Sequence, residues 1–464
     1  MSHDQSSLPV TVIGSGPVGL AAAAHLVTRG VPVKLYEAGD TVASHVREWG
    51  HVRLFSPWAF NTDSAARAIL REHGWQAPPA TALPTGSDLY SAYLQPLAET
   101  PLLRSVIETA ARVRTISRAG IDKVVSRGRG SHPFTLSIDM PDGGSRIDLA
   151  RAVIDASGTW ATQNPAAASG TPVAGEIIFV DRIAYGIPDV LGRDRATYAG
   201  QRVLVIGGGH SAANVLLDLA RLAEADPRLT MVWTVRAGNL ARVFGGGAAD
   251  RLPARGALGD DLKRLVDGGK LELALGFAVQ RIERAGDGLQ VSDQSGRALG
   301  PVDRIVVCTG QRPDLAMTRE LRLDLDPWLE SARALGPMID PNLHSCGSVP
   351  PHGYKALTHP EPNYFAVGIK SYGRAPTFLM ATGYEQVRSV VAHLAGDEAA
   401  ANDVRLVLPE TGVCSTNIAA EIAANAGCCG GPAPAETDAR CLADAEAKAD
   451  GAARCGAARV PADA

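Results

Sequence analysis

The sequence predicts an α/β protein built from two parallel-sheet units, one inserted into the other, followed by a cysteine-rich C-terminal tail. Residues 9–39 and 201–238 share one plan, a β-branched strand, a glycine-rich turn, an apolar helix and a second strand. Short apolar strands that alternate with helices are typical of a parallel sheet. Five of the seven cysteines follow residue 413, which sets the tail apart from the rest of the chain.

The bulk composition is that of an ordinary globular chain. The 464 residues are 45% hydrophobic and carry a net charge of −4, so nothing favours nucleic acid or an anionic membrane as a partner. The apolar start, residues 8–27, contains Pro17 and several glycines and follows no basic segment. It therefore predicts a buried strand, turn and helix rather than a membrane span or a secretory signal. Reduced thiols and a cytoplasmic location are expected.

The first glycine-rich turn, "GSGPVG", has the spacing of a dinucleotide-binding turn. Gly14 permits the tight turn, Gly16 lets a pyrophosphate approach the backbone, and Gly19 lets the helix pack closely on the strand. Glu37 ends the second strand, where its carboxylate can accept hydrogen bonds from ribose hydroxyls. A plain strand–helix–strand unit is the alternative. The predicted contact residues are Gly14, Ser15, Gly16, Pro17, Gly19 and Glu37.

The second turn, "GGGHSA", has alanine at the third position, and its second strand ends in an arginine instead of an acid. An acid would repel the 2′-phosphate of NADP, whereas a guanidinium binds it in a bidentate manner. This difference predicts NADPH rather than NADH. The alternative is that Arg236 is only a solvated residue at a strand end. The predicted contact residues are Gly207, Gly209, Ser211, Ala212, Arg236 and Arg242.

Two dinucleotide sites in one chain indicate a tightly held FAD and a nicotinamide that reduces it. Small residues, Gly158 and Gly310, end two further strands, where a backbone can run beneath a cofactor. A helix is expected to start near Thr377. The predicted domains are a first part of the FAD domain at 1–165, an inserted NADPH domain at 195–300, a second part of the FAD domain at 301–400 and the tail at 401–464.

The paired turns, the "ASG" and "CTG" strand ends and the segment "NYFAVGIKSYGRAPTF" resemble the two-dinucleotide-binding-domain flavoproteins. That family includes thioredoxin reductase and the flavin-containing monooxygenases, and the resemblance covers about residues 8–395. It implies two Rossmann-like domains, with FAD along the first and NADPH in the inserted one. It further implies that the first turn holds the ADP half of FAD, with Val125 near the adenine, Gly158 near the ribityl chain and Gly368 near the flavin.

Departures from the family narrow the choice. Residues 195–300 lack the Cys-x-x-Cys pair of thioredoxin reductases, and residues 40–60 lack the redox pair of glutathione reductases. Ile369 and Lys370 replace the acid that is usual in disulfide reductases. "GGGHSA" resembles the NADPH turn of the monooxygenases, although their F-x-G-x-x-x-H fingerprint is missing. The body and the "CCGG" tail also resemble the flavin monooxygenases encoded in arsenic-resistance operons.

Two further segments supply candidates for chemistry. In residues 44–58, Trp49 could line the flavin pocket and Arg53 could bind an anion or stabilise the cofactor. Cys346 and His352 stand in a Pro/Gly-rich loop, a composition that often lies near function. The catalytic candidates are therefore Arg53, Cys346 and His352. The alternative for each is ordinary packing or a structural role.

The tail supplies soft ligands that suit a thiophilic ion such as arsenic(III). Its spacing does not match the Cys-x₂₋₄-Cys pairs of zinc fingers. Mercuric reductase illustrates a rival use of a C-terminal vicinal pair, but the receiving dithiol is missing here. The remaining alternative is a disordered tail with incidental thiols. The metalloid candidates are Cys414, Cys428, Cys429, Cys441 and Cys455.

Together these observations predict an FAD- and NADPH-dependent monooxygenase that uses O₂ on a small substrate, such as a trivalent arsenical. The alternatives are an NADPH-dependent dithiol or metalloid reductase that uses the tail cysteines, and a flavin redox sensor or metalloid scavenger without turnover. A homodimer is compatible with the sequence, which does not determine the oligomeric state.

Overall fold

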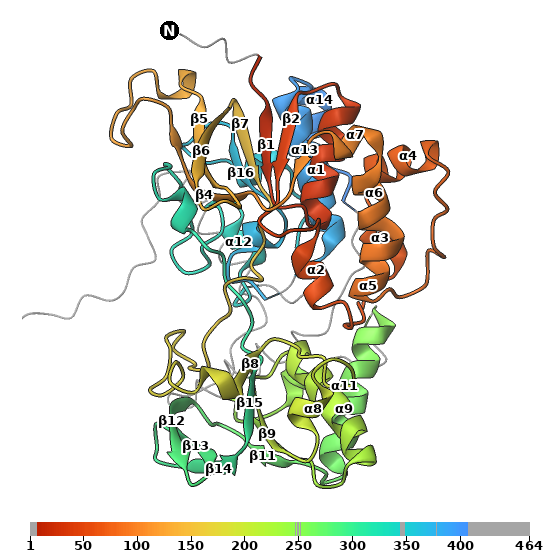
Figure 1. The fold of residues 1–464 in the computed structure, drawn as a ribbon, viewed down its shortest axis with the longest axis vertical. Helices are drawn as coiled ribbons and strands as arrows, with labels where there is room; N and C mark the ends of the chain where they lie inside the picture. The colour runs from red at the N-terminus through yellow and green to blue at the C-terminus, as the bar shows by residue number, and fades with distance from the viewer. Residues whose placement is uncertain are drawn as a thin grey trace, which may run out of the picture. The chain divides into compact units, whose positions relative to one another are not determined.

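The computed structural model describes residues 7–245, 247, 250, 252–343, 349–376 and 378–406. These residues belong to one compact unit, Met1–Ser415, which contains two parallel sheets (Figure 1). We refer to each parallel sheet, with the elements packed on it, as the first and the second sheet domain. Within the described ranges, no helix combines the length and the apolar character needed to cross a membrane.

The first sheet domain is built on five parallel strands with β1 at the centre. From β1 the chain passes through helix α1 (Pro17–Thr28) to β2 on one side, and later returns to β7 on the other. The strand order therefore reverses between β1 and β7, the place at which open α/β sheets bind ligands beyond the carboxyl ends of the strands. In spatial order the strands are β16 (Tyr364–Ala366), β7 (Ala152–Asp155), β1 (Val10–Ile13), β2 (Val33–Tyr36) and β3 (Ile107–Glu108).

Helices α1 and α13 (Met380–Leu394) cover one face of this sheet, and a three-stranded antiparallel sheet covers the other (Figure 1). In β16, Phe365 packs with the helices, while its neighbour Tyr364 packs with the antiparallel strands. Because successive side chains point to opposite faces and both faces are covered at the centre of the sheet, every residue of the central strand β1 is buried, and its sequence VTVI is mostly apolar. The antiparallel strands are β4 (Arg112–Arg118), β5 (Phe134–Asp139) and β6 (Ser145–Ala150).

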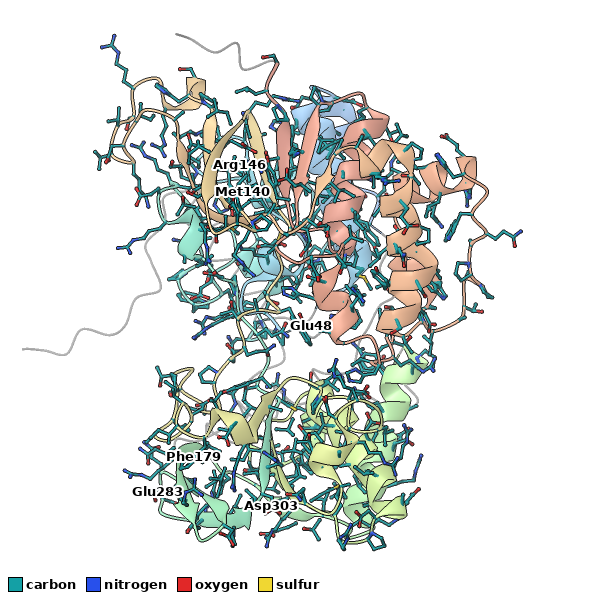
Figure 2. All side chains as sticks on the ribbon, in the orientation of Figure 1. Glu48, Met140, Arg146, Phe179, Glu283 and Asp303 are labelled. Atoms are coloured by element: carbon teal, nitrogen blue, oxygen red, sulfur yellow. The ribbon has the colours of Figure 1, made fainter. Side chains whose placement is uncertain are left out.

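Arg146 ties this antiparallel sheet to the edge of the first parallel sheet. Its guanidinium lies 2.7 Å from a carboxylate oxygen of Glu108 on β3 and 3.0 Å from the sulfur of Met140. Figure 2 shows Arg146 and Met140 in the antiparallel layer. The two-residue strand β3 is thereby held by a side-chain ion pair as well as by its backbone pairing with β2.

The second sheet domain repeats this plan around β9. Helix α9 (His210–Ala225) links β9 to β10 on one side, and β15 pairs with β9 on the other. The strand order reverses between β9 and β15, which is the position equivalent to the β1–β7 boundary of the first sheet. In spatial order the strands are β11 (Glu272–Ala274), β10 (Thr230–Thr234), β9 (Arg202–Ile206), β15 (Arg304–Val307) and β8 (Ile183–Tyr185).

Helices α9 and α11 (Pro253–Asp267) cover one face of the second sheet, and a second antiparallel sheet covers the other. On β10, Trp233 packs with the helices and Val232 with the antiparallel strands. Asp303, labelled in Figure 2, precedes β15 and accepts a hydrogen bond of 2.7 Å from the backbone N–H of Arg202. The antiparallel strands are β12 (Val279–Ala285), β13 (Gly288–Asp293) and β14 (Ala298–Val302).

The second sheet extends past both expected boundaries of the inserted domain. Strand β8 lies before residue 195 and β15 lies after residue 300, yet both pair within the second sheet. The expected boundary at 300/301 therefore misplaces β15, which the sequence prediction put in the second part of the FAD domain. The reason is topological, because the sequence shows that a strand follows β14 but not which sheet it joins.

The helix expected near Thr377 is α13, which begins at Met380; Thr377 itself lies outside the described residues. The other helices are shorter and surround the first sheet domain or connect strands of the second. They are α2 (Ser44–Glu48), α3 (Trp58–Asn61), α4 (Ser64–Glu72), α5 (Gly86–Leu89), α6 (Gln95–Glu99), α7 (Pro101–Arg104), α8 (Arg195–Tyr198), α10 (Ala241–Phe244), α12 (Gly336–Ile339) and α14 (Glu398–Asn402).

Candidate cofactor sites

The first glycine turn connects β1 to α1. A Cβ atom added to each of its three glycines would have different neighbours. Gly14 has φ +91°, and a Cβ there would lie 2.7 Å from the carbonyl oxygen of Ala156, just beyond β7. A Cβ on Gly19 would lie 1.8 Å from the carbonyl oxygen of Gly14. A Cβ on Gly16 would meet no described atom within 4 Å. The turn therefore needs two glycines for its own packing and leaves the third facing open space, which fits the approach of a pyrophosphate.

Glu37 braces this turn in the structure. Its buried carboxylate accepts hydrogen bonds from the N–H of Ser15 at 2.9 Å and from the hydroxyl of Ser15 at 2.6 Å. Its other oxygen accepts from Gly39 N–H at 2.9 Å and from the Ser44 hydroxyl at 3.0 Å. The side chain of Ser15 is thus occupied within the protein. The ribose contact expected of Glu37 remains a prediction, and it would have to share this carboxylate.

The second glycine turn, between β9 and α9, has the same geometry. Gly207 has φ +134°, and a Cβ there would lie 2.3 Å from the carbonyl oxygen of Cys308, just beyond β15. Gly209 faces open space, with no described atom within 4 Å of a Cβ, and Ala212 is buried at the third position. In both turns the first glycine abuts the carbonyl of the residue that follows the strand across the reversal point. The second turn therefore also fits a bound pyrophosphate.

Arg236 follows β10 at the edge of the sheet that holds the second turn, since Gly207 N–H donates to the carbonyl of Thr234 at 3.0 Å. Arg236 and Arg242 are both exposed, and neither guanidinium makes an ion pair with a described residue. An unpaired guanidinium at this edge fits a 2′-phosphate. Ser211 is half-buried in the first turn of α9.

Three further predicted glycines follow strands of the two sheets. Gly158 lies just beyond β7 and Gly368 just beyond β16, and a Cβ on Gly158 would lie 3.9 Å from Ile369. Gly310 lies beyond β15 in the second sheet, where its carbonyl accepts from Asn164 N–H at 2.9 Å. The structure therefore brings Gly158 and Gly368 together at the first turn's edge of the first sheet and places Gly310 in the second.

The structure does not bring Val125 to the first turn. The backbone N–H groups beside Glu37 are those of Ala110 and Ala111, which donate to the carbonyls of Gly39 and Glu37. Strand β4 then carries the chain about 20 Å further before the loop that contains Val125. The prediction placed a family position in the loop between β4 and β5 instead of in the segment that enters β4.

The 44–58 segment contains aromatic residues with separate packing partners. The ring of Trp49 would lie 2.6 Å from a Cβ on Gly86, and Trp58 is buried in the core of the first sheet domain. Phe55 meets His210 of the second sheet domain edge to face, with 5.2 Å between ring centroids. Arg53 is exposed and donates to the carbonyl of Leu83 at 2.9 Å. Neither Trp49 nor Arg53 contacts a glycine turn in a described interaction.

His352 is buried, and it contacts a glutamine side chain that binds the loop after β16. Its Nδ1 lies 3.1 Å from the carbonyl of Pro350, and its Nε2 lies 3.0 Å from the side-chain nitrogen of Gln386. Gln386 in turn accepts from the N–H of Gly368 at 2.8 Å. This pattern fits a neutral imidazole that positions an amide, and not a group poised to exchange protons with a substrate. Gln386, which the sequence interpretation missed, carries no motif signal because it lies in the middle of a helix.

Burial lowers the pKa of His352 and, separately, of His359. In the unfolded chain both imidazoles take up a proton near pH 6.5, so the unfolded state binds more protons below that pH. We expect the melting temperature to fall as the pH drops from 7.5 to 5.5, with up to about 1.4 kcal/mol lost per pH unit and group. His352→Gln should reduce the pH dependence of the melting temperature, because it removes one of the two titrating groups. His359→Gln should reduce this dependence in the same way, because it removes the other. An unchanged slope in both variants would contradict the assignment.

Cys308 is the one cysteine among the described residues, and it is buried. Its thiol lies 3.2 Å from the carbonyl of Gly186, and burial raises its pKa to about 12. A thiol in this state is neither a nucleophile nor half of a redox pair. Cys346 and the five tail cysteines lie outside the described residues. Across the ranges that are described, no cluster of three or more His, Cys, Asp or Glu side chains could hold a metal ion.

Comparison with known proteins bears on the family and the fold of this chain. The model of a family described as pyridine nucleotide-disulphide oxidoreductase matches residues 8–331, more than half of the chain. The indole-3-pyruvate monooxygenase YUCCA1 of Oryza sativa subsp. japonica is 27% identical over 212 residues, 45% of this chain and 44% of that protein. Ferredoxin–NADP reductase 1 of Cupriavidus taiwanensis is 26% identical over 306 residues, 65% of this chain and 70% of the reductase. The chain thus spans less than half the length of the first relative.

Among solved structures, the bacillithiol disulfide reductase Bdr (YpdA) from Bacillus cereus superposes with a TM-score of 0.61 at 18% identity. The match covers 84% of this chain and 99% of the reductase. At this identity the likeness concerns the fold alone. The two relatives and the solved structure are named for three different reactions. The reaction of this chain must therefore be inferred from its own residues.

Proposed function

This chain belongs to the pyridine nucleotide-disulphide oxidoreductase family, and from that premise we propose that it is an FAD- and NADPH-dependent monooxygenase. FAD and a nicotinamide dinucleotide are its cofactors. We assign FAD to the first sheet domain and NADPH to the second. The support is that each domain contains a complete glycine turn with open space at its second glycine, at Gly16 and at Gly209.

One observation favours an oxygenase over a disulfide reductase. Disulfide reductases of this family pass electrons from the flavin to a pair of thiols, and the described residues offer only the buried Cys308. The lack of a thiol pair within the described residues favours an external acceptor for the electrons of the flavin. O₂ is such an acceptor, and similarity to a monooxygenase supports the choice.

Bound FAD would supply the redox chemistry that connects NADPH to O₂. The net reaction is NADPH + H⁺ + O₂ + substrate → NADP⁺ + H₂O + oxygenated substrate. The chain's own residues would hold the two dinucleotides: the N-termini of α1 and α9 would bind the pyrophosphates, and Arg236 would bind the 2′-phosphate. Because the oxygen chemistry belongs to the cofactor, no protein general base is required.

A second candidate is an NADPH-dependent reductase of an external acceptor. It is favoured by the match to ferredoxin–NADP reductase 1, which covers more of both chains than the monooxygenase match does. Such a reductase also works without a thiol pair. A dithiol or metalloid reductase that cycles the tail cysteines is a further version, and its residues lie outside those described.

Oxygen dependence separates these candidates. We expect the purified, FAD-loaded protein to consume O₂ when given NADPH, at a rate and coupling that rise with the true substrate. Oxygen uptake is measured with an electrode, and peroxide release is measured in parallel. Turnover of an artificial one-electron acceptor under anaerobic conditions, without NADPH-driven oxygen uptake in air, would favour the reductase and contradict the oxygenase. A protein that binds no FAD would contradict both.

For the substrate we propose a trivalent arsenical, which gains one oxygen atom and becomes pentavalent. The proposal rests on the soft thiols of the tail, which suit arsenic(III). In the same assay, arsenite should raise oxygen uptake, and a variant that ends at residue 406 should retain NADPH-driven uptake. If the truncated variant also keeps full arsenite stimulation, the tail has no part in recognising the substrate.

A further inference from the structure

Lys370 is a fully buried cation beside the two loops that the proposed function assigns to the flavin. It lies in the short 3₁₀ segment Gly368–Tyr372 that follows β16. Its side chain is 1% exposed, and its ammonium lies 2.7 Å from a carboxylate oxygen of Asp155, which is 0% exposed. A buried charge needs a partner and further hydrogen bonds to be tolerated.

Those further hydrogen bonds connect the ends of two strands. The Lys370 ammonium donates to the Ser157 hydroxyl at 2.9 Å, and that hydroxyl donates to Asp155 at 2.6 Å. The remaining Asp155 oxygen also accepts from the hydroxyl of Tyr364 at 2.9 Å. The backbone carbonyl of Asp155 accepts from Val367 N–H at 2.9 Å. Every group in this network therefore has a partner, and the network spans from β7 to β16.

The network is next in the chain to two glycines with left-handed backbone, Gly158 with φ +73° and Gly368 with φ +68°. Ser157 precedes Gly158, and Lys370 stands two residues after Gly368. Other buried ion pairs of this chain lie elsewhere, for example Arg255 with Asp250 at 2.6 Å in the second sheet domain. The contacts of Lys370 with Asp155 and Ser157 therefore link the segments that carry these two glycines.

We propose that Lys370 is a positioning residue for FAD, and this rests on the proposed function. Its ion pair with Asp155 fixes the loops at Gly158 and Gly368 relative to each other, so that the cofactor meets a preformed cradle. Holding a site in its binding geometry lowers the ordering cost of association.

The test follows FAD release from the purified holoenzyme by the fluorescence of free flavin. In Lys370→Met, which keeps the length of the side chain but not its charge, we expect release at least tenfold faster than from the wild type. Arg255→Met breaks a buried pair of the same kind in the second sheet domain and should leave FAD release within twofold. Lys370→Met with release within twofold of the wild type would overturn the inference.

The double variant Asp155→Asn/Lys370→Met separates positioning from mere stability. It leaves no unpaired buried charge, so its melting temperature in saturating FAD should recover most of what Lys370→Met loses. Its FAD release should nevertheless stay at least tenfold fast, because the clamp between the two loops is gone. Recovery of both properties would overturn the positioning role. A wild-type protein that retains no FAD would instead overturn the proposed function itself.

Discussion

Gly16→Ala should leave the protein folded but weaken FAD binding at least tenfold, whereas Gly19→Ala should prevent the first sheet domain from folding normally. The two glycines lie three residues apart in one turn. A Cβ on Gly16 meets no described atom within 4 Å, while a Cβ on Gly19 would lie 1.8 Å from a backbone oxygen. Overpacking of this kind costs about 1–3 kcal/mol or more. Alanine at Gly16, which caps helix α1, costs about 1 kcal/mol at most.

Melting temperature and FAD affinity of the two variants distinguish these roles. Gly209→Ala is the matched control, because Gly209 holds the equivalent open position in the second turn. It should weaken NADPH binding and leave FAD binding unchanged. If Gly16→Ala binds FAD as tightly as the wild type, the open space in front of Gly16 does not receive a pyrophosphate. Loss of FAD from Gly209→Ala would show that the two domains are assigned the wrong way round.

Arg236→Ala should raise the KM for NADPH by roughly 10- to 100-fold and leave the KM for NADH unchanged. Hydrogen bonds to a charged group contribute about 1.5–3 kcal/mol each, and about 1.4 kcal/mol is tenfold in affinity. Because the guanidinium is exposed and has no ion-pair partner among the described residues, its removal breaks no ion pair within them. Steady-state reduction of the flavin by each nucleotide measures the effect.

Arg228 is the matched control for this experiment. It precedes β10 while Arg236 follows the same strand, so the two arginines mark opposite ends of one element. Arg228 is exposed and pairs with Asp226 at 2.8 Å. Arg228→Ala should leave both KM values unchanged. An equal loss for NADPH and NADH in Arg236→Ala would mean that the residue acts on binding in general and does not select the 2′-phosphate.

Much of the architecture could be predicted from the sequence because it depends on local chemistry. A strand that is buried on both faces is mostly apolar, and "VTVI" and "RVLVI" are strands of this kind. The glycine spacing that follows each strand is a property of the turn itself, so Gly14, Gly16 and Gly19 could be assigned their places without a structure. The α/β class and the two parallel-sheet units are confirmed.

Three features could be assigned only from the structure, because each depends on residues that are far apart in the sequence. Strand β15 joins the second sheet by pairing with β9, about 100 residues earlier, and no local pattern indicates which sheet it enters. Val125 was misplaced because the segment beside Glu37 is set by the pairing of β2 with β3. His352 was expected to take part in catalysis, but its partner Gln386 comes from a helix 34 residues away, and together they hold Gly368.

The sequence by itself determined what each glycine turn can hold, because a turn's conformation and its helix N-terminus are formed by consecutive residues. Only the tertiary structure decided how the turns are supported. Glu37 braces the first turn through Ser15, and Lys370 pairs with Asp155 across 215 positions of the chain. Those contacts arise where the carboxyl ends of parallel strands meet, and the order of strands in a sheet is not written in any single stretch of sequence.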